Sequence, residues 1–103
     1  MNSCITCGMP LEGEHAADIG LETLDGLVCI HDSVDGRIRD AEEIFKGGVK
    51  FFLRGGEDGA YDLAERITRR NMNALPYWQA HPFALLDGEE ASDEEFAEAM
   101  SRI

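Results

Sequence analysis

The N-terminal third of the chain contains the stretch CITCGMPL at residues 4–11 and the stretch CIHD at residues 29–32. These two stretches hold all three cysteines of the sequence. A Cys-x-x-Cys pair on a tight turn places two thiolates on one side of a knuckle, and Gly8 relieves the backbone where it turns. An odd, clustered set of thiols is typical of a metal site rather than of a disulfide framework. The pattern therefore predicts that Cys4, Cys7 and Cys29 bind a metal ion, and thiolates favour Zn²⁺ or iron.

A β-hairpin is predicted between the two stretches. Residues 19–24 and 27–30 are short, apolar-rich runs separated by Asp25-Gly26. Asp-Gly in this setting signals a tight turn, because both residues tolerate a positive φ. The returning strand would bring Cys29 back to the knuckle, and a fourth ligand shortly after it would complete the tetrahedron that Zn²⁺ prefers.

The knuckle, the Asp-Gly hairpin and the following C-x-x-D-x-x-D-G segment resemble the zinc ribbon domain of small microbial proteins, which is sometimes attached to transcriptional regulators. Members of this family carry a Cys-x-x-Cys-Gly-Met-Pro knuckle and a second Cys-x-x-Cys after the hairpin. The match covers roughly the first third of the chain and implies zinc-ligand roles for Cys4, Cys7 and Cys29. The family's fourth cysteine falls on Asp32, so the chain departs from the family pattern at a ligand position.

Two residues compete for the fourth ligand position. Asp32 matches the family register and binds zinc through oxygen, whereas His31 is the commoner partner of thiolates but is displaced by one residue. We favour Asp32 on this register. A water molecule in the fourth position would instead create the open site that a catalytic zinc needs. His15, in the loop before the hairpin, and His81, which has no ligand spacing around it, are weaker candidates.

A first helix is predicted beyond residue 36, where apolar side chains recur at three- and four-residue steps over residues 38–52. Asp40, with Glu43 three positions later, has the spacing that caps a helix start, and Gly55-Gly56 is a predicted stop. Gly47-Gly48 interrupts the pattern, and adjacent glycines cost about 1 kcal/mol each inside a helix. The pair therefore predicts a break, a kink or a place where another backbone packs very close.

A second helix is predicted to start with Asp58 as its N-cap. It should end before Pro76, because the residue preceding a proline is disfavoured in the α region. Pro76-Tyr77-Trp78 then predicts a turn that lays Trp78 over the core. The aromatic pair is interpreted as a plug for a small core rather than as a ligand platform.

The C-terminal part is predicted to end in a short amphipathic helix. Residues 83–86 are apolar and are interpreted as a strand or an extended packing segment. Ser92 and Glu95 have the spacing of a capping box in front of the final helix. The sequence thus predicts a small α+β fold, with a zinc ribbon of two short β-hairpins in residues 1–36 and a helical extension in residues 37–103 packed on it as one unit.

Length and charge narrow the classes of function. The chain has 103 residues, with 9 Lys plus Arg against 21 Asp plus Glu and a net charge of −12. This balance disfavours attraction to nucleic acid, most strongly for the ribbon, because its residues contain no lysine or arginine. Two groups of basic side chains in the helical part are interpreted mainly as solvated faces, with a partner-binding surface as the alternative; they are Arg39, Lys46, Lys50 and Arg54, and Arg66, Arg69 and Arg70.

These observations favour a small zinc-binding protein with a structural Zn²⁺ site. The N-terminal residues lack the pattern of a signal peptide or membrane anchor, which predicts a cytoplasmic protein without membrane contact. We expect it to act through a protein partner, with a homo-oligomer left open and transcriptional regulation implied by the family resemblance. The alternative is a thiol-redox or zinc-dependent enzyme that uses Cys4 and Cys7 or an incomplete zinc site. Thioredoxin-type cysteine pairs lie at the N-terminus of a helix. The segment Gly8-Met9-Pro10, which follows the pair, opposes a helix there and so argues against the redox hypothesis.

Overall fold

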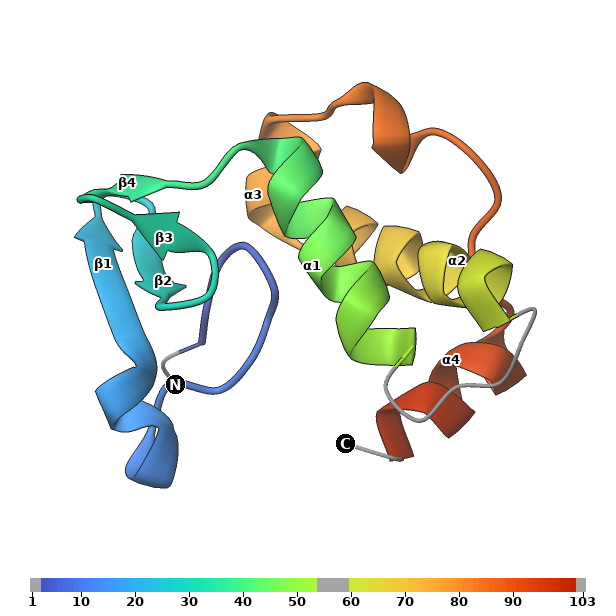
Figure 1. The fold of residues 1–103 in the computed structure, drawn as a ribbon, viewed down its shortest axis with the longest axis horizontal. Helices are drawn as coiled ribbons and strands as arrows, with labels where there is room; N and C mark the ends of the chain where they lie inside the picture. The colour runs from blue at the N-terminus through green and yellow to red at the C-terminus, as the bar shows by residue number, and fades with distance from the viewer. Residues whose placement is uncertain (1–2, 54–59, 102–103) are drawn as a thin grey trace.

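The N-terminal part of the chain forms two short antiparallel hairpins. In the computed structural model, which describes residues 3–53 and 60–101, a 3₁₀ turn (Gly13–Asp18) leads into strand β1 (Ile19–Thr23), which pairs with β2 (Gly26–Cys29). Strand β3 (Ser33–Val34) pairs with β4 (Arg37–Ile38). Both hairpins precede the helices, as Figure 1 shows, and the small α+β fold predicted from the sequence is confirmed.

The first hairpin turns one residue earlier than predicted. Thr23 and Gly26 are paired, so the turn consists of Leu24 and Asp25. The Thr23 hydroxyl accepts hydrogen bonds from the amides of Asp25 and Gly26 at 3.1 and 3.2 Å and so fixes this turn. Gly26 is required for a different reason: its φ is +135°, and a Cβ there would lie 2.8 Å from Ile5 of the knuckle.

The second hairpin turns at Asp35-Gly36. Both residues have positive φ, +50° and +77°, as a tight two-residue hairpin requires. These residues therefore join two strands, and the strand segment continues to Ile38, past the predicted border at residue 36.

Four helices follow the hairpins in the described residues: α1 (Ala41–Leu53), α2 (Ala60–Asn73), α3 (Pro76–Ala80) and α4 (Asp93–Ser101). Helix α1 runs without a break through Gly47-Gly48. A Cβ on Gly48 would lie 2.7 Å from the Thr68 side chain of α2, whereas one on Gly47 would meet nothing within 4 Å. The predicted break is absent, and close packing is found at Gly48 alone, where the neighbour is the Thr68 side chain rather than another backbone. The predicted stop at Gly55-Gly56 and the predicted cap at Asp58 lie outside the described residues.

Two predictions for the C-terminal half were wrong. Residues 76–80 form helix α3 rather than a turn, with Pro76 at the first position, where a missing N–H is tolerated. Ala84–Leu86 forms a short 3₁₀ helix rather than a strand or an extended segment. The capping box was predicted correctly: the Ser92 amide donates to Glu95 at 2.9 Å, and the Glu95 amide donates to the Ser92 hydroxyl at 3.2 Å.

The apolar side chains form two buried clusters. The helical cluster consists of Ile44, Phe45, Val49, Ala64, Met72, Trp78 and Leu86. The hairpin cluster consists of Cys4, Leu11, Val28 and Cys29. Ile38 packs against both clusters, and Trp78 is buried, as predicted. No helix among the described residues has both the length and the apolar character needed to cross a membrane.

The arginines of α2 hold the C-terminal segment instead of forming a solvated face. Arg66 pairs with Glu95 of α4 at 2.7 Å, and Arg70 pairs with Asp93 at 2.8 Å. Arg69 donates to the backbone oxygens of Leu85 and Glu89. The interpretation as a solvated face therefore fails for these three arginines, because backbone carbonyls and carboxylates of the following segment surround them. Lys46 and Lys50 of α1 are exposed.

Candidate metal centre

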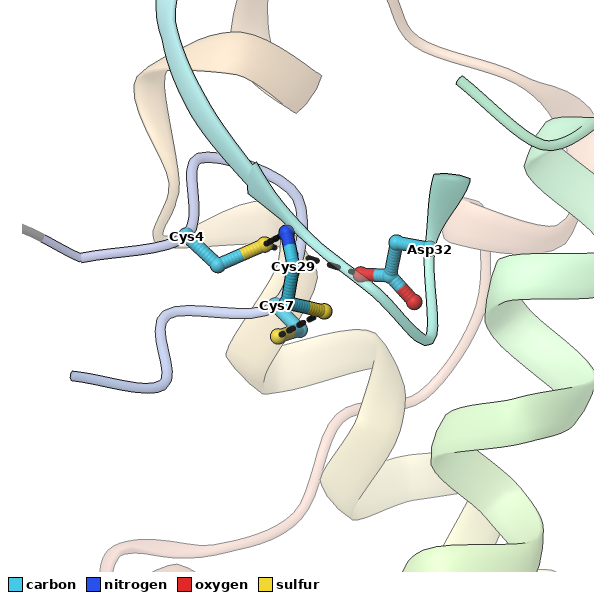
Figure 2. Close-up of side chains that lie close together, drawn as sticks. All are labelled: Cys4, Cys7, Cys29 and Asp32. Carbon is cyan, nitrogen blue, oxygen red and sulfur yellow. Dashed lines mark hydrogen bonds between the residues drawn. The ribbon is translucent and has the colours of Figure 1, made fainter. Parts of the chain in front are cut away.

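Four side chains from two segments of the chain converge beside the first hairpin. Cys4 and Cys7 lie on the N-terminal knuckle, Cys29 ends β2, and Asp32 lies in the turn that leads to β3. One ligand atom from each residue lies within 4.8 Å of the others. Figure 2 shows the three sulfur atoms grouped together with one Asp32 oxygen turned toward them.

The knuckle is shaped by backbone hydrogen bonds around Cys4. The Gly8 amide donates to the Cys4 carbonyl at 2.8 Å, and the Cys4 amide donates to the Met9 carbonyl at 2.9 Å. Gly8 has a φ of +82°, a region that favours glycine. The Ile5 amide donates to Leu27 of β2 at 3.0 Å, which attaches the knuckle to the hairpin. These contacts place the Cys-x-x-Cys pair next to Cys29.

Two separations within the cluster match the edges expected around a tetrahedral metal ion. Cys7 Sγ and Cys29 Sγ are 3.8 Å apart, and Cys4 Sγ lies 3.7 Å from Asp32 Oδ2. A tetrahedron with Zn–S bonds of about 2.3 Å and a Zn–O bond of about 2.0 Å has S···S edges of about 3.8 Å and an S···O edge of about 3.5 Å. The three cysteines carry no disulfide. The side chains present are therefore compatible with one four-coordinate ion.

The histidines lie outside this cluster. His31 is exposed, and its backbone carbonyl accepts a hydrogen bond from Arg39. His15 lies 3.2 Å from Asp18, and the ring of His81 stacks on that of Tyr77. Asp32, by contrast, is buried with 7% of its surface exposed. Of the two candidates for the fourth position, Asp32 is the one whose side chain lies with the cysteines.

The ionisable groups of the cluster influence one another strongly. Hydrogen bonding with Cys29 lowers the pKa of the Cys4 thiol and raises that of Cys7. The pKa of Cys29 is raised to about 12, chiefly through its hydrogen bond with Cys4. Burial raises the pKa of the Asp32 carboxyl. These shifts show that the four groups interact closely, and a divalent cation would supply positive charge that favours the ionised form of each ligand.

Three further residues contact the site and were not identified from the sequence. The Thr6 hydroxyl donates to Asp32 Oδ2 at 2.7 Å. Trp78 Nε1 donates to the Thr6 carbonyl at 2.9 Å, and Asn71 Nδ2 donates to the Cys7 carbonyl at 3.0 Å. The position of Thr6 inside the Cys-x-x-Cys motif is a signal that could have been used. No local pattern connects Asn71 or Trp78 with the knuckle, because they lie on α2 and α3, 64 and 72 positions from their partners in the sequence.

Comparison with known proteins identifies no relative: no protein-family model, no curated protein and no solved structure matches the chain. The resemblance to a zinc ribbon therefore rests on the motif of the first third. What indicates a function is the geometry of Cys4, Cys7, Cys29 and Asp32.

Proposed function

We propose that this protein is a small cytoplasmic zinc-binding protein in which Cys4, Cys7, Cys29 and Asp32 hold one Zn²⁺ in a zinc ribbon. The observation that carries the proposal is the convergence of three sulfurs and one carboxylate oxygen within 4.8 Å of one another. A donor set dominated by thiolates selects soft or borderline metals over Ca²⁺ and Mg²⁺. Zn²⁺ accepts sulfur and oxygen together in a four-coordinate site.

The role proposed for the metal is structural. It would link the knuckle to the end of β2, two segments that otherwise share a small buried cluster. Four protein ligands leave no coordination position for a reacting water molecule, which disfavours a zinc-dependent enzyme. The chain turns at Gly8 directly after Cys7, so the pair lacks the helix N-terminus that activates a redox thiol. These features support the structural site over both enzymatic alternatives.

The proposed mode of action is contact with a protein partner, and regulation of transcription is the form implied by the motif resemblance. The hairpin region exposes the apolar side chains Ile19, Leu24 and Ile30, and it contains acidic residues but no basic ones before Arg37. A partner with apolar and basic side chains would complement this surface, whereas a nucleic acid would be repelled.

Metal analysis of the purified chain tests the proposal. We expect one zinc per chain, and we expect Asp32→Ala to weaken zinc affinity far more than His31→Ala. His31 is a matched control because it adjoins Asp32 but lies outside the cluster. An iron–sulfur chromophore, or metal-free protein that melts at the same temperature, would contradict the zinc site. The opposite ranking of the two variants would contradict the choice of Asp32.

A pull-down with zinc-loaded protein tests the mode of action. Leu24 is fully exposed at the hairpin turn, so Leu24→Asp should leave the fold and the zinc content unchanged. We expect a partner captured by the wild-type chain to be lost with this variant. Equal capture by both proteins would exclude the hairpin turn as the contact surface.

A further inference from the structure

Thr6 lies between Cys4 and Cys7 in the sequence, and its hydroxyl lies between Cys4 and Asp32 in the structure. Its side chain is completely buried. Its hydroxyl donates to Asp32 Oδ2 at 2.7 Å and lies 3.0 Å from Cys4 Sγ. The same Asp32 oxygen is the one that lies 3.7 Å from Cys4 Sγ. Thr6 therefore contacts the carboxylate at the atom that faces the sulfurs.

The position of Thr6 is itself fixed from the helical side of the molecule. Trp78, which is 3% exposed, donates its indole N–H to the Thr6 carbonyl at 2.9 Å. Asn71 holds the next carbonyl, that of Cys7, at 3.0 Å. Leu75 lies close to Gly8: a Cβ added to Gly8 would be 3.6 Å from the Leu75 side chain. The Thr6 hydroxyl is thus presented to Asp32 by a backbone that α2 and α3 hold in place.

Asp32 needs such a partner more than a cysteine ligand would. A buried carboxylate loses its hydration and must recover hydrogen bonds from the protein. It also lies in a turn, where the backbone alone does not orient its two oxygens. Hydrogen-bond partners behind a metal ligand orient it and typically contribute 10- to 100-fold to metal affinity.

We infer that Thr6 is a positioning residue of the metal centre, whose hydroxyl holds the Asp32 carboxylate in the orientation that completes the tetrahedron. This inference rests on the zinc site proposed above. It explains how a carboxylate can serve in a place where the resembling family has a cysteine: the neighbouring threonine supplies the orientation that a single-atom thiolate ligand does not require.

The test compares substitutions that remove or keep the hydroxyl. Thr6→Val preserves the side-chain shape and should weaken zinc binding about 10- to 100-fold, measured by competition with a chromophoric chelator. Thr6→Ser keeps the hydroxyl and should bind within a few-fold of wild type. Thr68→Val is the matched control, because Thr68 is also buried but bonds to Ala64 within α2. We expect it to leave zinc affinity unchanged.

A double-mutant cycle with Asp32→Ala separates positioning from a general structural role. If Thr6 acts through Asp32, Thr6→Val should cause no further loss of affinity in the Asp32→Ala background. Co²⁺ absorption bands provide a second readout and should change with Thr6→Val but not with Thr6→Ser. An equal loss in both backgrounds, or wild-type affinity in Thr6→Val, would overturn the inference. If Thr6→Val does not fold, the inference would be overturned by a Thr6→Ser protein that binds zinc as weakly as Asp32→Ala. Failure of wild-type protein to bind zinc would instead reject the proposed function.

Discussion

The hairpin region and the helical region of this molecule bury very different sets of side chains. Two of the four residues in the hairpin cluster, Cys4 and Cys29, are candidate metal ligands. The helical cluster has seven members, among them Phe45 and Trp78, and none is a candidate ligand. A small set of buried aliphatic groups rarely stabilises a fold by itself, and a structural metal commonly supplies the missing free energy. We therefore expect the hairpins to depend on the proposed metal and the helices on hydrophobic packing.

The two regions are nevertheless connected through the knuckle. Trp78 and Asn71 donate to the carbonyls of Thr6 and Cys7, and Ile38 packs against both clusters. In Figure 1 the N-terminal loop lies between the hairpins and the helices. The helices therefore position one half of the candidate metal site, whereas the end of β2 and the following turn supply the other half through Cys29 and Asp32.

Removal of the metal should have the largest effect and should separate the two regions. We expect chelation to collapse the dispersed amide signals of residues 3–38 in a ¹H–¹⁵N NMR spectrum. The signals of residues 41–53 and 60–101 should stay dispersed, because their core contains no metal ligand. Structural zinc contributes about 10–16 kcal/mol of apparent binding free energy in small domains, enough to determine whether the hairpins fold.

Two outcomes would contradict the expectation that only the hairpins depend on the metal. A loss of dispersion along the whole chain would show that the helical core also depends on the metal. A spectrum that stays unchanged after complete metal removal would show that the hairpins fold without it.

Shortening a buried side chain of the helical cluster tests whether the helical region depends on hydrophobic packing. Phe45 is 2% exposed in the helical cluster, and Phe45→Ala should lower the free energy of unfolding by about 3–5 kcal/mol. Phe51 lies on the same helix with 41% of its surface exposed, so Phe51→Ala should cost less. Denaturant melts followed by circular dichroism measure both. Under conditions where the variants are folded, zinc affinity should remain that of wild type, and a parallel loss of affinity would argue against separate cores.

The parts of the fold that the sequence predicted are those encoded by neighbouring residues. The capping box joins Ser92 and Glu95, and the first hairpin was located within one residue. Asp32 was favoured from the register of a short motif, and its side chain lies with the cysteines. Thr6 and Trp78 are 72 positions apart, and no local pattern encodes their hydrogen bond. The same holds for the contacts of the α2 arginines with the C-terminal segment, which form only when that segment folds back.

The glycine pair of α1 offers a finer test of packing within the helical region. Gly48→Ala would place a methyl group 2.7 Å from Thr68 of α2, and overpacking of this kind costs about 1–3 kcal/mol. Gly47 is exposed with open space around it, so Gly47→Ala should stabilise the helix by about 1 kcal/mol through helix propensity alone. Thermal melts of the two variants should shift in opposite directions. Stabilisation by both would mean that α1 and α2 can move apart without cost.

The contact between α2 and α4 should respond to acid in a way that the apolar core does not. The hydrogen bond from Arg66 lowers the pKa of Glu95 from 4.5 to about 2. Because the folded pKa lies below the unfolded one, this contribution to stability is complete above about pH 4.5 and is lost as the pH falls toward 2. The carboxyl carbon of Glu95 should therefore titrate with a pKa of about 2 in ¹³C NMR.

Glu95→Gln and Glu94→Gln distinguish this contact from the general effect of charge. Both remove one negative charge from α4, but Glu95 pairs with Arg66 whereas Glu94 is exposed at the adjacent position. Hydrogen exchange in α4 reports the contact locally, apart from any release of metal at low pH. In wild type and in Glu94→Gln, protection of α4 should decrease between pH 4.5 and 2, because the ion pair is neutralised there. In Glu95→Gln this step should be smaller, because only the pair of Arg70 with Asp93 then remains between the two helices. An identical step in all three proteins would show that another acidic group, such as Asp93 in its pair with Arg70, controls the contact instead of Glu95.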